Sequence, residues 1–75
     1  MEKIERARVQ IILKSPFFAH LLLYIRCKPS KKIQTVATDG KFIYYNEKFV
    51  EKLTDLEVQG VLVHELLHCA LLHLE

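Results

Sequence analysis

The sequence predicts an α+β protein, in which N-terminal helices and a β-hairpin precede a long C-terminal helix. Apolar residues recur at helical spacing early in the chain, an Asp-Gly pair separates two β-rich segments, and a capped apolar run follows near the end. The chain has 75 residues, of which 51% are hydrophobic, so residues 1–75 are expected to form a single folded domain.

The first helix is predicted to end at about Lys14. Ile4, Ala7 and Ile11 recur at the spacing of one helical face. Neighbouring apolar residues are expected to widen that face: Val9, Ile12 and Leu13.

A second helix is predicted from Pro16 to about Cys27. Ser15 can cap its free amides, and proline is tolerated at the first helical position. Pro29 ends the segment, because proline cannot continue a helix without losing a hydrogen bond. This helix is expected to be central to the core, because it is apolar on nearly every side: Phe17, Phe18, Leu21, Leu22, Leu23 and Ile25.

The segment IQTVATDGKFIYY predicts an antiparallel β-hairpin. Its strands would be Ile33–Thr38 and Lys41–Tyr45, joined by Asp39-Gly40. Asp-Gly favours a type I′ turn, in which both central residues have positive φ. Asp39 is therefore explained by its turn rather than by a functional site.

Two further local patterns lead to the last helix. Asn46–Lys52 is expected to form a brief turn or helix with Phe49 and Val50 pointing inward. Thr54-Asp55-Leu56-Glu57 matches a capping box, so the last helix should begin at Asp55 and continue to the end of the chain.

Charge and cysteine content exclude several classes of function. Residues 1–41 carry nine Lys/Arg and three Asp/Glu, whereas residues 42–75 carry two and six, which together give the net charge of +2. The basic residues are dispersed and not interleaved with aromatic residues, so no nucleic-acid partner is expected. Cys27 and Cys69 do not form a CxxC motif, and the N-terminus has no signal-peptide pattern, which favours a reducing, cytoplasmic setting. No membrane partner is expected, because the apolar runs are too short or are interrupted by His and Glu.

One segment has the residue spacing of a zinc-binding motif: His64-Glu65-Leu66-Leu67-His68. On a helix of about 3.6 residues per turn, His68 lies roughly 40° and Glu65 roughly 100° from His64. Both imidazoles can therefore face one Zn²⁺ at about 2.0 Å, while Glu65 would reach a zinc-bound water and act as the base in peptide hydrolysis. The alternative is the ordinary polar face of an amphipathic helix. We favour the metal site, because the rest of the helix is apolar enough to require burial and buried polar groups need partners.

A third protein ligand is missing from this pattern. His73 would lie roughly 180° from His64, and His20 is isolated on an apolar helix, so neither is predicted to bind metal. The third ligand could come from absent sequence or a second chain, or the site could bind weakly. We favour a truncated protein, in which Leu74-Glu75 could be a vector-derived scar.

Three blocks of the sequence together resemble a known family: ARVQIILKSPFFAHLLLYI, ATDGKFIYYNEKFV and LVHELLHCALLH. The chain is similar to the bacterial and archaeal metallopeptidase domain that precedes a von Willebrand factor A-like domain. The resemblance implies a zincin-like fold, with His64 and His68 as zinc ligands and Glu65 as the catalytic acid/base. It also implies that this chain is the N-terminal fragment of a larger protein, with a further ligand beyond the motif, and is inactive alone.

The resemblance leaves a second function open. This is a non-catalytic interaction module that works with the A-like domain and a partner ATPase.

The zincin comparison also implies a substrate site. Phe42–Tyr45 would bind an extended peptide or protein substrate by strand addition, with Tyr44 or Tyr45 near the oxyanion. The alternative for at least one of these tyrosines is a place in the core.

Overall fold

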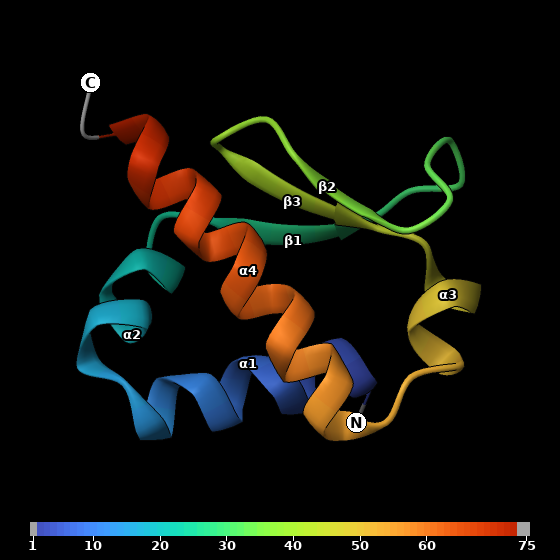
Figure 1. Ribbon diagram of the computed structural model, residues 1–75, viewed down its shortest axis with the longest axis horizontal. Coiled ribbons are helices and arrows are strands. Elements are labelled where there is room, and N and C mark those ends of the chain that lie inside the picture. The colour runs from blue at the N-terminus through green and yellow to red at the C-terminus, as the bar shows by residue number, and fades with distance from the viewer. Residues whose placement is uncertain (1, 74–75) are drawn as a thin grey trace.

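The protein consists of a small β-sheet with helices packed on one face, as a computed structural model shows for residues 2–73 (Figure 1). The helices and strands are, in order, α1 (Lys3–Lys14), α2 (Pro16–Leu22), β1 (Arg26–Pro29), β2 (Val36–Thr38), β3 (Phe42–Tyr45), α3 (Glu47–Glu51) and α4 (Asp55–His73). The α+β prediction is confirmed.

Across the part of the chain that the structure describes, the strands form one three-stranded mixed sheet with β3 in the middle. β1 pairs with β3 in parallel, and β2 pairs with β3 antiparallel. Successive side chains of a strand point to opposite faces, so Ile43 and Tyr45 face the core while Phe42 and Tyr44 lie on the other face. The edges of this sheet are therefore β1 and β2.

The core is apolar and draws most heavily on α1, α4 and β3. Its buried residues are Ile4, Ala7, Ile11, Leu22, Ile25, Ile43, Tyr45, Val50, Val58, Leu62, Leu66 and Cys69. Figure 1 shows α4 crossing the middle of the domain, from the N-terminal end of α1 to the tip of the β2–β3 hairpin. Within residues 2–73, no helix is both long and apolar enough to cross a membrane.

α1 confirms the predicted helix but corrects its predicted apolar face. Ile4, Ala7 and Ile11 are buried as expected. Because α4 and α2 pack against the side of α1 that carries those residues, three others that were predicted to widen the face are exposed: Val9, Ile12 and Leu13. An ion pair of 3.1 Å between Arg6 and Asp55 joins α1 to the start of α4.

α2 begins as predicted but is shorter and more peripheral. Ser15 Oγ accepts the Phe18 N–H at 3.3 Å, which is the expected N-cap. The helix ends at Leu22 rather than at Cys27, and a tight turn follows. The predicted place in the core is confirmed for Leu22 and Ile25, which are buried. It is wrong for Phe17 and Leu23, which are 57% and 74% exposed.

β1 was not predicted. Residues 26–29 were expected to complete α2 and a loop, but they pair with β3 instead. That partner lies 16 positions further along the chain, since Arg26 is opposite Phe42, so local periodicity does not reveal it. Pro29 is tolerated there because β1 is an edge strand.

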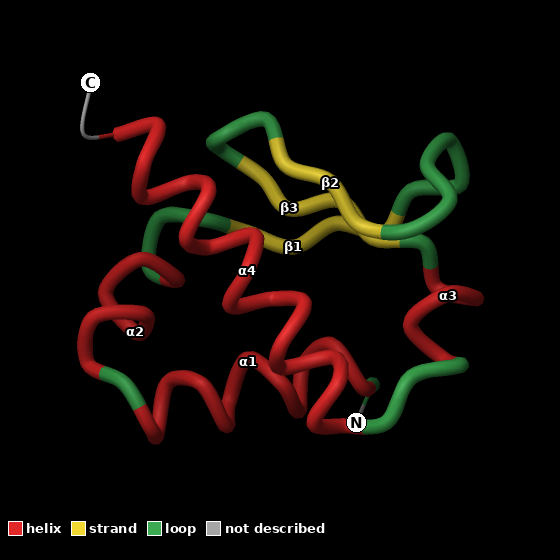
Figure 2. Tube along the Cα trace, in the orientation of Figure 1, coloured by secondary structure: helices red, strands yellow, loops and turns green. Residues whose placement is uncertain are grey.

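The predicted antiparallel hairpin is confirmed, although its first strand begins at Val36 rather than at Ile33. Figure 2 shows the connection between β1 and β2 as a long loop that projects beyond the sheet. Asn46 orders this loop, since its Nδ2 donates to the Ile33 carbonyl at 2.9 Å and its backbone N–H to Thr35 at 2.8 Å.

The prediction of a type I′ turn with Asp39 and Gly40 at its centre is wrong. Asp39 N–H donates to the Phe42 carbonyl at 3.4 Å, so Gly40 and Lys41 are the central residues of the turn. Of these two, Gly40 has positive φ, at 92°. Asp39 Oδ1 accepts the backbone N–H groups of Phe42 and Lys41, each at 2.9 Å, and these bonds lower the pKa of Asp39. The structural role predicted for Asp39 is thus confirmed.

The N-termini of α3 and α4 are both capped by side chains. Asn46 Oδ1 accepts the Phe49 N–H at 3.0 Å, and α3 directs Val50 into the core, as predicted. The capping box is confirmed: Thr54 N–H donates to Glu57 Oε1 at 2.8 Å, and Glu57 N–H donates to Thr54 Oγ1 at 3.2 Å. α4 accordingly begins at Asp55, as expected.

Replacing Glu57 with Gln is expected to remove part of the acid sensitivity of folding. The Thr54 N–H and hydroxyl hold the pKa of Glu57 below its usual value. This stabilisation is present above the unfolded-state pKa and is lost as pH falls through the lower folded-state pKa. Urea unfolding between about pH 6 and pH 3 should show a smaller loss of stability for Glu57→Gln than for wild type. Parallel curves for the two proteins would argue against a contribution from Glu57.

Candidate metal centre

α4 presents different surfaces to the core and to solvent. Val58, Leu62 and Leu66 lie on its buried side, together with Cys69. His64 and His68 are exposed, and Glu65 is half-buried between these two surfaces. The expectation that the polar stripe would be buried is therefore wrong for the histidines. Burial does not force them to find partners, so the case for a metal depends on their geometry.

The two imidazoles converge. His64 Nε2 and His68 Nε2 are 3.0 Å apart, with ring centroids 4.6 Å apart and ring planes at 82°. Two nitrogens bound to one tetrahedral zinc at about 2.0–2.1 Å would lie about 3.3 Å apart. The observed separation is thus about 0.3 Å shorter than the separation that two ligands of one zinc ion would have. The same distance also suits a hydrogen bond from one neutral ring to the other.

Glu65 lies on the side of the histidine pair that faces the hairpin. Leu72, two turns further along α4, lies roughly 20° from Glu65 around the helix axis. Its Cδ1 is near the hairpin tip, where a Cβ added to Gly40 would lie 3.4 Å from it. Thr38 Oγ1 and Cys69 Sγ, 3.1 Å apart, also join β2 to α4. The hairpin thus runs along the Glu65 side of the helix.

Thr38 is a residue whose role was missed at the sequence level. It holds β2 against α4 next to His68, and its hydroxyl donates to the Phe42 carbonyl at 2.7 Å. A threonine in a short strand gives no local indication of a contact 31 residues away.

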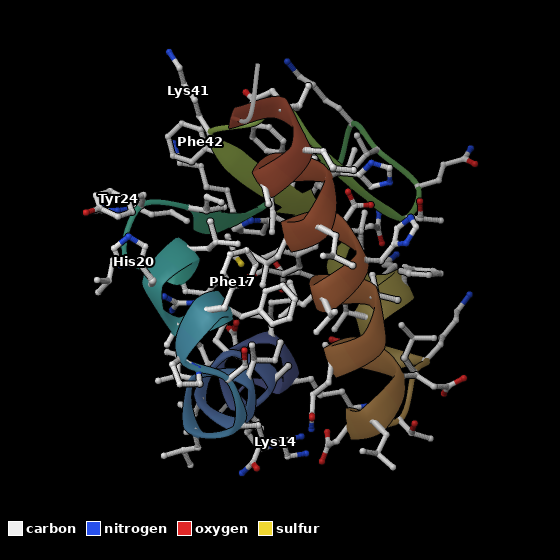
Figure 3. The ribbon with its side chains drawn as sticks, turned by 60° about the vertical axis from the view of Figure 1, so that its left-hand side comes forward. Lys14, Phe17, His20, Tyr24, Lys41 and Phe42 are labelled. Carbon is white, nitrogen blue, oxygen red and sulfur yellow. The ribbon has the colours of Figure 1, made fainter. Side chains whose placement is uncertain are left out.

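A third ligand is not brought to this pair by the described residues, which contain no group of three His, Cys, Asp or Glu suited to a metal. His20 is on α2, where its ring packs against Tyr24 with centroids 5.4 Å apart. Figure 3 shows both rings on the far side of α2 from α4, so the structure does not bring His20 to the histidine pair. The predictions for the His73 side chain and for Leu74-Glu75 concern positions outside the described residues.

The described residues do not bring a cysteine together with the two histidines. Both are free, and Cys69 is fully buried on the core side of α4. Burial raises the pKa of the Cys27 thiol to about 11. Burial thus disfavours the thiolate of Cys27, which is the form that binds metals.

The predicted substrate strand and oxyanion residues need correction. β3 is the central strand, so Phe42–Tyr45 has a neighbour on each edge and cannot take an added strand. Tyr44 is on the sheet face opposite the helices, and its hydroxyl donates to Asp39 Oδ2 at 3.1 Å. Tyr45 is 6% exposed and belongs to the core, as the alternative reading held. Neither tyrosine is therefore placed to stabilise an oxyanion at the histidine pair.

The sequence matches one known family over its whole length. The family described as "Putative metallopeptidase domain" matches residues 1–75. An uncharacterized protein from Thermotoga maritima is 31% identical over 77 residues, a match that covers 96% of this chain and 19% of that protein. The chain therefore spans about a fifth of the length of this relative. No solved structure matches the chain significantly.

The family match agrees with the resemblance seen in the sequence. A metallopeptidase domain implies a metal cofactor in general, and the converging imidazoles of His64 and His68 are chemically suited to hold one. The chain belongs to the family of putative metallopeptidase domains.

Proposed function

We propose that the protein is a zinc-dependent metallopeptidase domain in which His64 and His68 hold the metal and Glu65 is the catalytic acid/base. The observation that supports this proposal most strongly is the 3.0 Å separation of the two Nε2 atoms on an exposed face of α4. Membership of a metallopeptidase family makes a shared metal a better explanation of this pair than a simple hydrogen bond.

Glu65 would carry the proton transfers. Bound zinc would polarise the scissile carbonyl and lower the pKa of the attacking water to about 7. The Glu65 carboxylate, beside the histidine pair and half-buried, takes the proton from that water. It then returns the proton to the amine as the peptide bond breaks.

The substrate would be an extended peptide or protein segment. β2 is an edge strand, and it lies along the side of α4 that carries Glu65. An extended main chain that pairs with the free edge of β2 would run beside the histidine pair. The substrate would therefore bind at β2, and not at β3.

The third ligand would come from beyond the described residues. The match covers 19% of the Thermotoga maritima relative, so a longer family member has further sequence that could supply it. A von Willebrand factor A-like domain and an ATPase partner belong to this wider proposal.

A non-catalytic interaction module is a second candidate function. It is favoured by the large apolar side chains that α4 exposes beside the histidines, among which Leu56 and Leu71 are 73% and 61% exposed. Exposed apolar surface of this kind marks protein–protein contacts. In this case the surface of α4 would bind a partner protein, and no peptide would be cleaved.

Zinc titration of single-histidine variants tests the metal site. His64→Ala and His68→Ala should each weaken zinc binding in calorimetry by at least the roughly 10- to 100-fold that loss of a ligand's hydrogen-bond partner costs, because each removes one of the two ligands that the described residues supply. His20→Ala is the matched control, since it removes an exposed imidazole away from the site. Unchanged affinity in the first two variants, or an equal loss in the control, would contradict the assignment.

A further inference from the structure

A zinc ion held by His64 and His68 alone would have two coordination positions left. Zinc in proteins is almost always tetrahedral when its role is structural. We infer that two copies of this chain share one zinc ion, each contributing His64 and His68, and that α4 packs against α4 across a two-fold axis. This inference rests on the proposed metal site and describes a second form of it, in which another copy of the chain, and not further sequence, completes the coordination.

The exposed face of α4 beside the histidines is apolar. Leu71 and Leu67 lie within roughly 60° of His64 around the helix axis. Their exposed fractions are 61% and 45%. Two apolar leucines one turn from the metal ligands would be buried by a second helix that reached the same ion, which adds a hydrophobic contribution to the coordination energy.

Gly60 leaves space on this face. It is exposed, and a Cβ added to it would have no atom within 4 Å. Glycine inside a helix is less favourable than alanine, and the φ of Gly60 is not positive, so its backbone does not require glycine. A glycine in such a position allows another helix to approach closely.

In a dimer with a two-fold axis at the histidine pair, a side chain of the second copy would fill the space at Gly60. In an antiparallel arrangement that places His64 of one copy opposite His68 of the other, Leu71 of the second copy falls opposite Val61, beside Gly60. The leucine side chain then lies over the glycine. Because the interface is two-fold symmetric, the same contact occurs twice.

The charges on this face are also compatible with two copies and one ion. Between Gly60 and Leu71, Glu65 is the charged residue of the sequence. The carboxylates from two copies carry a total charge of −2 and balance the +2 charge of zinc. Glu57 lies on the same side of the helix but is turned back onto Thr54. Four imidazoles would leave no position for water, so this dimer would be a form without peptidase activity.

Sedimentation equilibrium with stepwise addition of zinc tests the dimer. Without zinc we expect the 8.8 kDa monomer. At half an equivalent of zinc we expect twice that mass, with reversal by EDTA. His68→Ala should remain monomeric. Leu71→Ala should raise the zinc-dependent dimer dissociation constant at least tenfold, whereas Leu23→Ala, which removes an equally large exposed leucine at the C-terminal end of α2, should not change it.

Each other result overturns the inference. A monomer that binds one zinc per chain would overturn the dimer while leaving the proposed metallopeptidase site intact. If the protein does not bind zinc, both the zinc-bridged dimer and the proposed metallopeptidase site would be wrong. A dimer that forms without zinc, or that persists in His68→Ala, would show that the ion does not bridge the two copies.

Discussion

Replacing Glu65 with Gln is expected to reduce peptide hydrolysis by about 10²- to 10⁴-fold, the usual contribution of a general acid/base, while zinc affinity stays unchanged. The amide keeps the size of the side chain and its half-buried position, but it cannot accept a proton from water. Hydrolysis of a fluorogenic peptide library would be measured in the presence of zinc, on this chain and on a longer polypeptide that includes it.

The matched control is Glu57→Gln, which makes the same chemical change on α4 but within the capping box. It should leave the rate of hydrolysis unchanged. Equal rates for Glu65→Gln and wild type, or no hydrolysis by either wild-type form, would contradict the catalytic role and favour the interaction module.

Replacing Leu66 with Ala is expected to cost about 2–5 kcal/mol of folding free energy, because Leu66 is completely buried and the change leaves a cavity. A domain of this size has a total stability near the low end of about 5–15 kcal/mol. At the upper end of this cost the variant would be largely unfolded at 25 °C, and at the lower end it would keep about 3 kcal/mol of stability. Urea titration followed by circular dichroism measures the difference.

Leu67→Ala is the comparison, because it removes the same atoms one residue further along α4, where the side chain is 45% exposed. We expect a cost below about 1 kcal/mol for this surface position. Equal destabilisation by the two substitutions would mean that α4 packs with a different face toward the core.

Features set by local hydrogen bonds were predictable from the sequence. Ser15 and Thr54 cap helices through groups three residues away, so a short window contains all the information that their positions require. The antiparallel hairpin at Asp39 and Gly40 was predictable for the same reason. The central residues of its turn were not, because Asp39 uses its carboxylate to organise the following backbone.

Features that depend on distant partners were not predictable. β1 exists because residues 26–29 pair with β3, and this pairing also makes β3 central rather than an edge. Val9 and Phe17 look like core residues in the sequence, but no neighbouring element covers them in the described part of the chain. Periodicity identifies an apolar face without showing whether another element packs on it.

The candidate site was predictable in its spacing and not in its surroundings. A separation of four residues places His64 and His68 on one side of a helix, and the rings do converge. Their exposure and the hairpin beside Glu65 follow from tertiary packing. The family was identifiable from the sequence, whereas zinc and the roles of the three residues remain predictions.

NMR of the histidine rings tests the proposed metal site most directly. With nitrogen-15 labelling and one equivalent of zinc at neutral pH, we predict large shifts of Nε2 in His64 and His68, with the proton on Nδ1, and little change in His20. Shifts of His64 and His68 no larger than those of His20 would mean that the 3.0 Å contact is only a hydrogen bond between two imidazoles.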